Sequence, residues 1–309
     1  MEQPTVSELF TRWDVPWLPT VGLVLVALTY ATGWARARRT RPAELPPWRL
    51  AAFLSGLASI FVAISSPLDT FSESLLFMHM AQHFVLMSIA PPLLVLGTPV
   101  VPLLRGTPRS VIRILEPVFR SRVVHALLRH PKRNLFAWLA MNVAYVGWHV
   151  PAAYEFALKS ENWHNVEHAC FLFTSVLFWW PVIRPWPSRQ PQGSPRTGLR
   201  SGGGETKSQL SLIFYLLCAD LVNTVVSAFL CFSGRLVYPS YADAERPFPL
   251  SALNDQIAAG SFMWVFGSLV FLVPVAMIIM RALSPRVLGL PDLSVSSTPD
   301  NQHAGGEAV

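Results

Sequence analysis

The sequence predicts an all-α membrane protein, a bundle of seven transmembrane helices with the N-terminus outside and the C-terminus inside. Three observations support this fold class. Apolar residues make up 52% of the 309 residues and charged residues only 14%, whereas a soluble domain carries about 25% charged residues. The charged residues lie between long apolar runs. The basic ones gather in alternate loops, as the positive-inside rule requires.

Seven apolar segments form the expected spans, each near the roughly 20 helical residues that a bilayer requires. The second and fourth are the shortest, and they have tryptophans close by, such as Trp48 and Trp148, which suit the membrane interface. Because the first residues are polar and acidic, we expect no cleaved signal peptide. The seven spans are 18–35, 50–66, 74–97, 134–150, 164–183, 209–231 and 257–280.

The distribution of lysine and arginine sets the orientation. With the N-terminus outside, the inner segments 36–49, 98–133, 184–208 and the C-terminal tail hold 5, 8, 5 and 2 of them, which is 20 of the 24. The outer segments hold only the remaining four and carry most of the acidic residues between helices. The net charge of +6 therefore reflects membrane orientation, and we expect no nucleic-acid partner.

The expected spans divide the chain into three parts. We expect 1–17 to be an outer N-terminal segment, 18–283 the transmembrane domain and 284–309 a disordered inner tail. Within the domain, residues 103–130 interleave apolar residues with arginines, which indicates a basic amphipathic helix on the inner membrane surface. A soluble helix packed under the bundle explains the same pattern equally well. Residues 185–206 are rich in Pro, Gly and Ser and predict a flexible inner loop.

Five histidines lie at the outer ends of three expected spans. His79 and His83 are four residues apart near the start of the third span, and His164 and His168 repeat this spacing in the fifth. Such a spacing places two imidazoles on one helix face, about 6 Å apart along the axis. The fourth span runs outward and ends at His149. Chain direction thus brings all five within about two turns of the outer face.

This pattern favours a metal site. A single membrane histidine more often forms a hydrogen bond to a neighbouring helix, but two matched pairs and a fifth histidine fit that explanation less well. Imidazole suits Cu, Zn, Fe and Ni, and thioether or thiol sulfur favours Cu(I). Sulfur-bearing residues nearby make copper the expected metal, although methionine in a helix is usually packing. They are Met78, Met80, Met87, Cys170 and Met263.

Several acidic residues could support the histidines or form an ion path. Glu167, Asp69 and Asp255 are candidates to fix a histidine tautomer, although Glu167 could instead face interface water or pair with Lys159. Asp220 lies in the middle of the sixth span. It is either part of an ion or proton path or a hydrogen-bonded helix contact.

Two further features of the sequence constrain structure and function. Pro91 and Pro92 predict a kink in the third span that leaves backbone carbonyls in need of partners. The sequence contains no Walker A motif, no G-x-G-x-x-G after a strand, no H-E-x-x-H and no G-x-S-x-G. We therefore expect no ordinary enzymatic activity.

Three stretches resemble the CtaG-type family of caa3 cytochrome c oxidase assembly factors. They are MHMAQHFVLMSIAPPLLVLGTP at 78–99, the WHVP…HNVEH…FWWPV region at 148–182, and DQIAAGSFMWVFGSLVFL at 255–272. The resemblance covers residues 50–282. One departure is Phe266, where relatives often have a proline, and it concerns the shape of the seventh span.

The resemblance implies a role in maturing a haem–copper oxidase in the bacterial plasma membrane. Implied partners are oxidase subunits, the lipid bilayer and extracytoplasmic copper chaperones, with copper as the cargo. The implied functional positions are His79, Gln82, His83, Pro91, Pro92, Trp148, His149, Pro151, His164, Glu167, His168, Asp255, Gln256 and Trp264.

Four hypotheses follow from the residues and the resemblance together. The first is an assembly factor that holds copper at the outer face and delivers it to an oxidase subunit. The second is a transporter of copper or another cation. The third is a b-type haem protein with axial histidines from the third and fifth spans. The fourth is a scaffold whose histidines only join helices.

Overall fold

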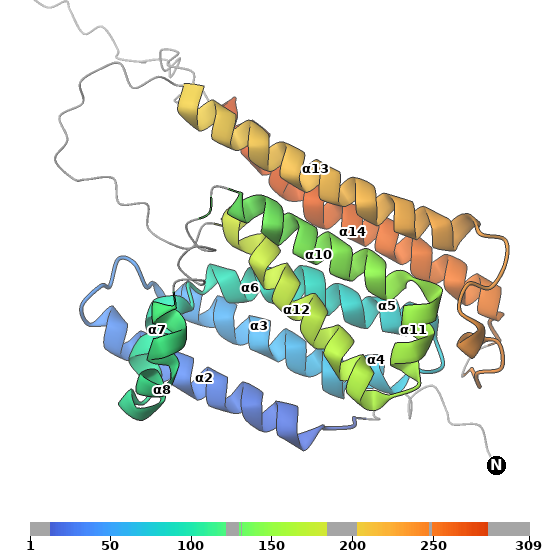
Figure 1. Ribbon diagram of the computed structural model, residues 1–309, viewed down its shortest axis with the longest axis horizontal. Coiled ribbons are helices and arrows are strands. Elements are labelled where there is room, and N and C mark those ends of the chain that lie inside the picture. Colours follow the sequence, from blue (N-terminus) through green and yellow to red (C-terminus); the bar gives the residue numbers. More distant parts are fainter. Residues whose placement is uncertain (1–12, 122–129, 131, 184–202, 247–248, 284–309) are drawn as a thin grey trace, which may run out of the picture.

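The computed structural model describes residues 13–121, 130, 132–183, 203–246 and 249–283, and all regular structure within them is helical (Figure 1). The main helices are α2 (Trp17–Arg38), α3 (Pro47–Ser65), α5 (Leu76–Phe84), the π-helix η1 (Val85–Ile89), α6 (Ala90–Leu96), α10 (Arg133–His149), α12 (Glu161–Ile183), α13 (Gly203–Phe232) and α14 (Ala252–Ala282). Shorter helices are α4 (Pro67–Thr70), α7 (Val100–Gly106), α8 (Arg109–Arg120), α11 (Pro151–Leu158) and the 3-10 helix η2 (Pro239–Tyr241).

Six helical segments in the described part of the chain are long and apolar enough to cross a membrane. The protein is therefore a multi-pass membrane protein. The fourth expected span, 134–150, is not among these six; it corresponds to α10, whose 17 residues reach about 25 Å, less than the roughly 30 Å of a hydrocarbon core. The six segments are Trp17–Arg38, Pro47–Thr70, Leu76–Leu96, Glu161–Ile183, Gln209–Phe232 and Ala252–Arg281.

The helices form one bundle with the third span near its middle. Helices α13 and α14 lie side by side along most of their length, and α14 also packs against α5 (Figure 1). On the other side, α12 packs against α10 and α6, and α3 packs against α6. Large apolar side chains such as Phe214 and Val265 remain exposed, which suits helices that face lipid.

The helix changes type where Pro91 and Pro92 predicted a kink. Residues Val85–Ile89 form a π-helix directly before the two prolines. Pro91 has no backbone N–H, so the carbonyl of Met87 loses its ordinary α-helical donor. The indole Nε1 of Trp179 on α12 donates to that carbonyl at 3.1 Å. A side chain of a neighbouring span thus satisfies the group that proline left free.

The single amphipathic helix expected at 103–130 is divided into two helices, α7 and α8. Residues 122–129 and 131 lie outside the described residues. Helix α7 packs closely on α2, since a Cβ at Gly33 would collide with the carbonyl oxygen of Pro102.

The inner loop expected at 185–206 is shorter than predicted. The backbone of 203–206 already belongs to α13, because extending an existing helix adds one hydrogen bond for each residue fixed. The rest of that loop, the outer segment 1–12 and the tail 284–309 lie outside the described residues.

We expect Trp179→Phe to destabilise the protein by about 1–2 kcal/mol, because the carbonyl of Met87 would lose the one side-chain donor that the described residues offer it. Thermal unfolding in detergent measures this change. Trp180→Phe is the matched control, since Trp180 packs against the same core without a described hydrogen bond from its indole. Equal effects of the two substitutions would show that ring packing, and not the hydrogen bond, holds α12 to η1.

Candidate metal centre

Four of the five predicted histidines converge between α5 and α12. Each of His79, His83, His164 and His168 offers one ring nitrogen, and these atoms all lie within 4.8 Å of one another. The ring centroids of His79 and His83 are 4.3 Å apart, and those of His164 and His168 are 4.2 Å apart. Across the helices, the centroids of His79 and His164 are 5.0 Å apart. The two i,i+4 pairs thus face each other at one depth, as the sequence predicted.

The hydrogen bonds around His79 determine which of its ring nitrogens carries the proton. The hydroxyl of Tyr241 donates to the carbonyl of Ser72 at 2.7 Å, so it accepts from its other neighbours. Nδ1 of His79 lies 3.2 Å from this hydroxyl oxygen and must carry the proton. The lone pair is therefore on Nε2, which accepts a hydrogen bond from Nε2 of His83 at 2.9 Å. Two imidazole nitrogens thus point at each other inside the bundle.

Other ring nitrogens at the site lack partners. Nδ1 of His83 and Nε2 of both His164 and His168 are buried, and the described residues offer them no hydrogen bond. His79, His83 and His168 are buried, and His164 is half-buried. Buried polar groups are ordinarily paired, so several unpaired nitrogens in one place indicate room for a ligand that accepts their lone pairs.

Glu167 places a carboxylate beside this cluster. Its Oε1 is 3.8 Å from Nε2 of His83, and its side chain is 1% exposed. Neither carboxylate oxygen has a hydrogen-bond partner in the described part of the chain. A buried carboxylate without donors is costly, and a cation among the four imidazoles would offset that cost. The alternative pairing of Glu167 with Lys159 is not seen among the described residues.

His149 lies beside the cluster and not within it. Its ring centroid is 6.5 Å from that of His83, and it is not one of the four histidines whose nitrogens converge. Nδ1 lies 2.7 Å from the carbonyl of Tyr145, so this nitrogen carries the proton. Nε2 is buried and has no hydrogen bond from the described residues. His149 therefore presents a free lone pair to a neighbouring cavity.

The acidic residues expected to orient histidines bond elsewhere. Asp255 accepts from the backbone N–H groups of Leu76 and Phe77 at 2.7 and 3.1 Å, and so caps the start of α5 from α14. Asp69 accepts from Gln82 at 2.6 Å. A free N-terminal N–H pair favours a carboxylate, which explains the role of Asp255. Both residues fix the position of α5, and the tautomers are set by Tyr241 and a backbone carbonyl.

The tyrosines over the site were not predicted from the sequence. The hydroxyl of Tyr154 on α11 lies 2.9 Å from that of Tyr241, and Tyr238 donates to the carbonyl of His149 at 3.0 Å. Gln256 holds the backbone of the same loop, since it accepts from the N–H of Val237 at 2.7 Å. Burial raises the pKa of the Tyr241 hydroxyl, so it stays a proton donor. No spacing rule relates residue 241 to residue 79, and only the fold brings them together.

The remaining predicted residues lie apart from the cluster. Met263 lines a cavity next to it, together with Met80 and Met87. Asp220 lies on α13 outside the lining of that cavity, and its Oδ1 is buried without a described partner. Cys170 is a half-buried free cysteine.

Comparison with known proteins identifies the family. The family model "Cytochrome c oxidase caa3 assembly factor (Caa3_CtaG)" matches residues 28–284. The chain belongs to the caa3 assembly factor family. This match confirms the resemblance seen in the motifs.

Relatives of this family member are found in mycobacteria. An uncharacterized protein of Mycobacterium bovis is 28% identical over 292 residues, which is 92% of this chain and 40% of that protein. An uncharacterized protein of Mycobacterium leprae is 28% identical over 272 residues, with 85% and 38% coverage. The chain thus spans about 40% of the length of these curated relatives. No solved structure matches the chain.

We expect Glu167→Met to raise the free energy of unfolding of the metal-free protein by about 1–3 kcal/mol, because an unpartnered buried carboxylate is replaced by an apolar side chain of similar size. Thermal unfolding in the presence of a chelator measures the effect. Glu161→Met in the first turn of the same helix is the control, since Glu161 is exposed. A loss of stability in Glu167→Met would show that the carboxylate has a favourable partner in the metal-free protein.

Proposed function

We propose that this assembly factor binds copper at the outer membrane face through His79, His83, His164 and His168 and passes it to a subunit of the oxidase. The observation that carries the proposal is the convergence of four imidazoles from two helices, three of them buried, beside a carboxylate that has no hydrogen-bond partner among the described residues. Membrane proteins seldom bury ionisable groups without a function. Here the groups are of the type that copper prefers.

The geometry suits a small ion bound by nitrogen. Metal–imidazole bonds are about 2.0–2.1 Å long, which places tetrahedral ligands about 3.3 Å apart. The Nε2 atoms of His79 and His83 are 2.9 Å apart, so they would spread slightly around an ion, and the other two rings would turn inward. The carboxylate of Glu167 supplies a negative charge at the same place.

The enclosure of the site suits cargo that is held and then released. Tyr241, in the loop between α13 and α14, is joined to the cluster by its hydrogen bond with His79, and Tyr238 in the same loop donates to the carbonyl of His149 beside the cluster. His164 is the most exposed of the four histidines, so exchange with a copper chaperone or an oxidase subunit would proceed on its side. Displacement of one ligand at a time lets an ion pass between proteins without being released into water.

The haem alternative fits this arrangement poorly. A macrocycle between axial histidines needs a flat gap, whereas the Nε2 atoms of His79 and His83 lie 2.9 Å apart and all four ligand nitrogens lie within 4.8 Å. Transport across the membrane has weaker support than delivery, because Asp220 does not line the cavity beside the site.

The topology completes the proposal. We propose that α10 is a seventh, short span and that the N-terminus lies outside and the C-terminus inside, in the bacterial plasma membrane. The bias of Lys and Arg toward alternate loops supports this orientation. Helix α10 joins the basic segment before Arg133 to α11 near the histidines, and local thinning of the bilayer accommodates a short span at modest cost.

We expect the purified protein to bind copper, and the variant with His79, His83, His164 and His168 all changed to Ala to lose that copper, with an affinity at least about 100-fold lower. Elemental analysis after dialysis against a weak chelator gives the copper content per chain. His130→Ala is the control, because His130 is an exposed histidine that does not belong to the cluster. Equal copper in the wild type and the four-histidine variant would contradict the site.

We expect a cysteine at position 159 to react with a membrane-impermeant maleimide in intact cells, and a cysteine at position 132 to react only after the membrane is opened. The variants are Lys159→Cys and Lys132→Cys in a background without native cysteines. Because α10 lies between these two positions, opposite sidedness means that it crosses the membrane. Labelling of both variants in intact cells would contradict the short span.

A further inference from the structure

A cavity next to the histidine cluster is lined by half of the methionines of the chain. Its walls include Met80, Met87, Met141 and Met263, four of the eight methionines. They come from α5, η1, α10 and α14. Since α5 and η1 follow each other in one span, three segments far apart in the sequence contribute thioethers, and the third span contributes two. Met80, Met141 and Met263 are at most 5% exposed. The cavity also adjoins the cluster directly, because His83 lines both.

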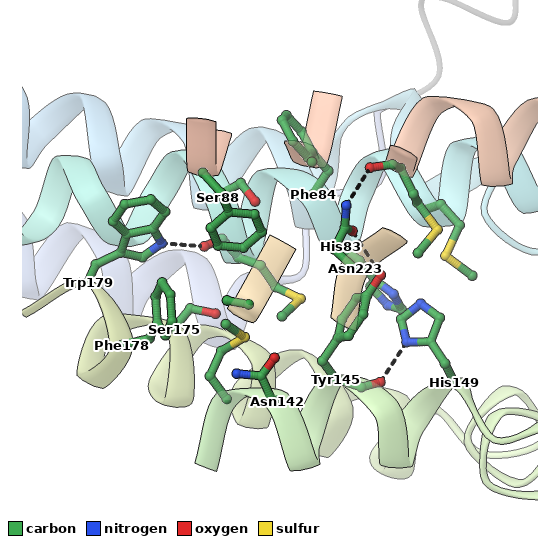
Figure 2. Close-up of a pocket in the computed structure, with 17 residues that line it drawn as sticks. His83, Phe84, Ser88, Asn142, Tyr145, His149, Ser175, Phe178, Trp179 and Asn223 are labelled. Atoms are coloured by element: carbon green, nitrogen blue, oxygen red, sulfur yellow. Dashed lines mark hydrogen bonds between the residues drawn. The ribbon is translucent and has the colours of Figure 1, made fainter. Parts of the chain in front are cut away.

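The polar groups of this cavity are mostly occupied. Tyr145 donates to Asn223 at 3.1 Å, and Asn223 donates to the carbonyl of Met263 at 3.3 Å. Asn142 donates to the carbonyl of Trp138 at 2.8 Å. Three lining residues are exceptions (Figure 2): Nε2 of His149, Nδ1 of His83 and the hydroxyl of Ser175 are buried and unpaired among the described residues. The thioether sulfurs, two imidazole nitrogens and one hydroxyl are therefore the groups that remain free.

Size and charge restrict what the cavity can hold. Its volume is about 50 Å³, which is enough for an ion with a water molecule but far below the roughly 300 Å³ of a pocket for an organic ligand. The residues that line it include no carboxylate, so a divalent cation would remain uncompensated. A monovalent cation costs less to bury, and thioether ligands select soft ions.

We infer that the cavity is a second metal site, which binds Cu(I) through the thioethers of Met80, Met141 and Met263 and Nε2 of His149, with Met87 at its inner side. Packing alone explains a single methionine. It does not explain four thioethers around unfilled space with an unpaired imidazole nitrogen. This inference rests on the proposed copper function and adds an inner station, reached through His83.

The test measures copper ligands directly on the full chain in lipid nanodiscs, loaded with Cu(I) under ascorbate. X-ray absorption at the copper edge separates sulfur from nitrogen neighbours. We expect sulfur neighbours in the wild type. In the variant with Met80, Met87, Met141 and Met263 changed to Leu, we expect the sulfur signal to disappear and about one copper per chain to be lost. Met→Leu nearly conserves volume, so folding should be retained.

The control variant changes Met277 and Met280 to Leu, since both are exposed on α14 and lie outside the cavity lining. It should keep the sulfur signal. If the four-methionine variant does not fold, Met141→Leu and Met263→Leu are tested singly, and each should lower the number of sulfur neighbours. Copper with nitrogen neighbours alone in the wild type would overturn the inference.

The outer site is tested separately with the variant in which His79, His83, His164 and His168 are changed to Ala. If it keeps sulfur-bound copper, the inner station exists whether or not the outer site does. If the wild type binds nitrogen-coordinated copper that only this variant loses, the outer site stands and the inner station fails. If neither the wild type nor any variant binds Cu(I), both proposals fail.

Discussion

A bilayer offers no water to a polar group, so every buried donor and acceptor must find its partner within the protein. Most of the unusual features of this bundle satisfy that requirement. Trp179 supplies the donor that Pro91 cannot, and Asp255 caps the start of α5 from a helix almost 180 residues later. Gln82 donates to the carbonyl of Ala63, and Gln256 accepts from the backbone N–H of Val237. The bonds of Trp179, Asp255 and Gln82 hold the third span in place between its neighbours.

Among the described residues, the histidine and glutamate side chains without complete partners gather at one end of the bundle. His83, His168 and Glu167 are buried without complete partners, and His149 keeps one free nitrogen. A protein that spends stability in this way usually gains a function from it. The helices are therefore fixed by satisfied polar groups, and the site is made of unsatisfied ones.

The sequence predicted much of this fold because spans and orientation depend on local composition. All seven expected segments are helical, although α10 is shorter than a bilayer. The kink at Pro91 was predicted, because a missing N–H acts locally. The shared depth of His79 and His164 was also predicted, since chain direction and loop charge fix depth without knowledge of packing. The end of the loop expected at 185–206 was predicted too late in the sequence, because composition does not determine where a helix such as α13 begins.

The sequence by itself therefore determined which segments are helices, how the basic loops are distributed and at which end the histidines lie. Only the tertiary structure decided that four histidines converge while His149 turns to a separate cavity, that Tyr241 fixes the tautomer of His79, and that methionines of four elements meet. The physical reason is that depth follows from position along one helix. Rotation about the helix axis and the choice of neighbours follow from packing among helices, which no local pattern encodes.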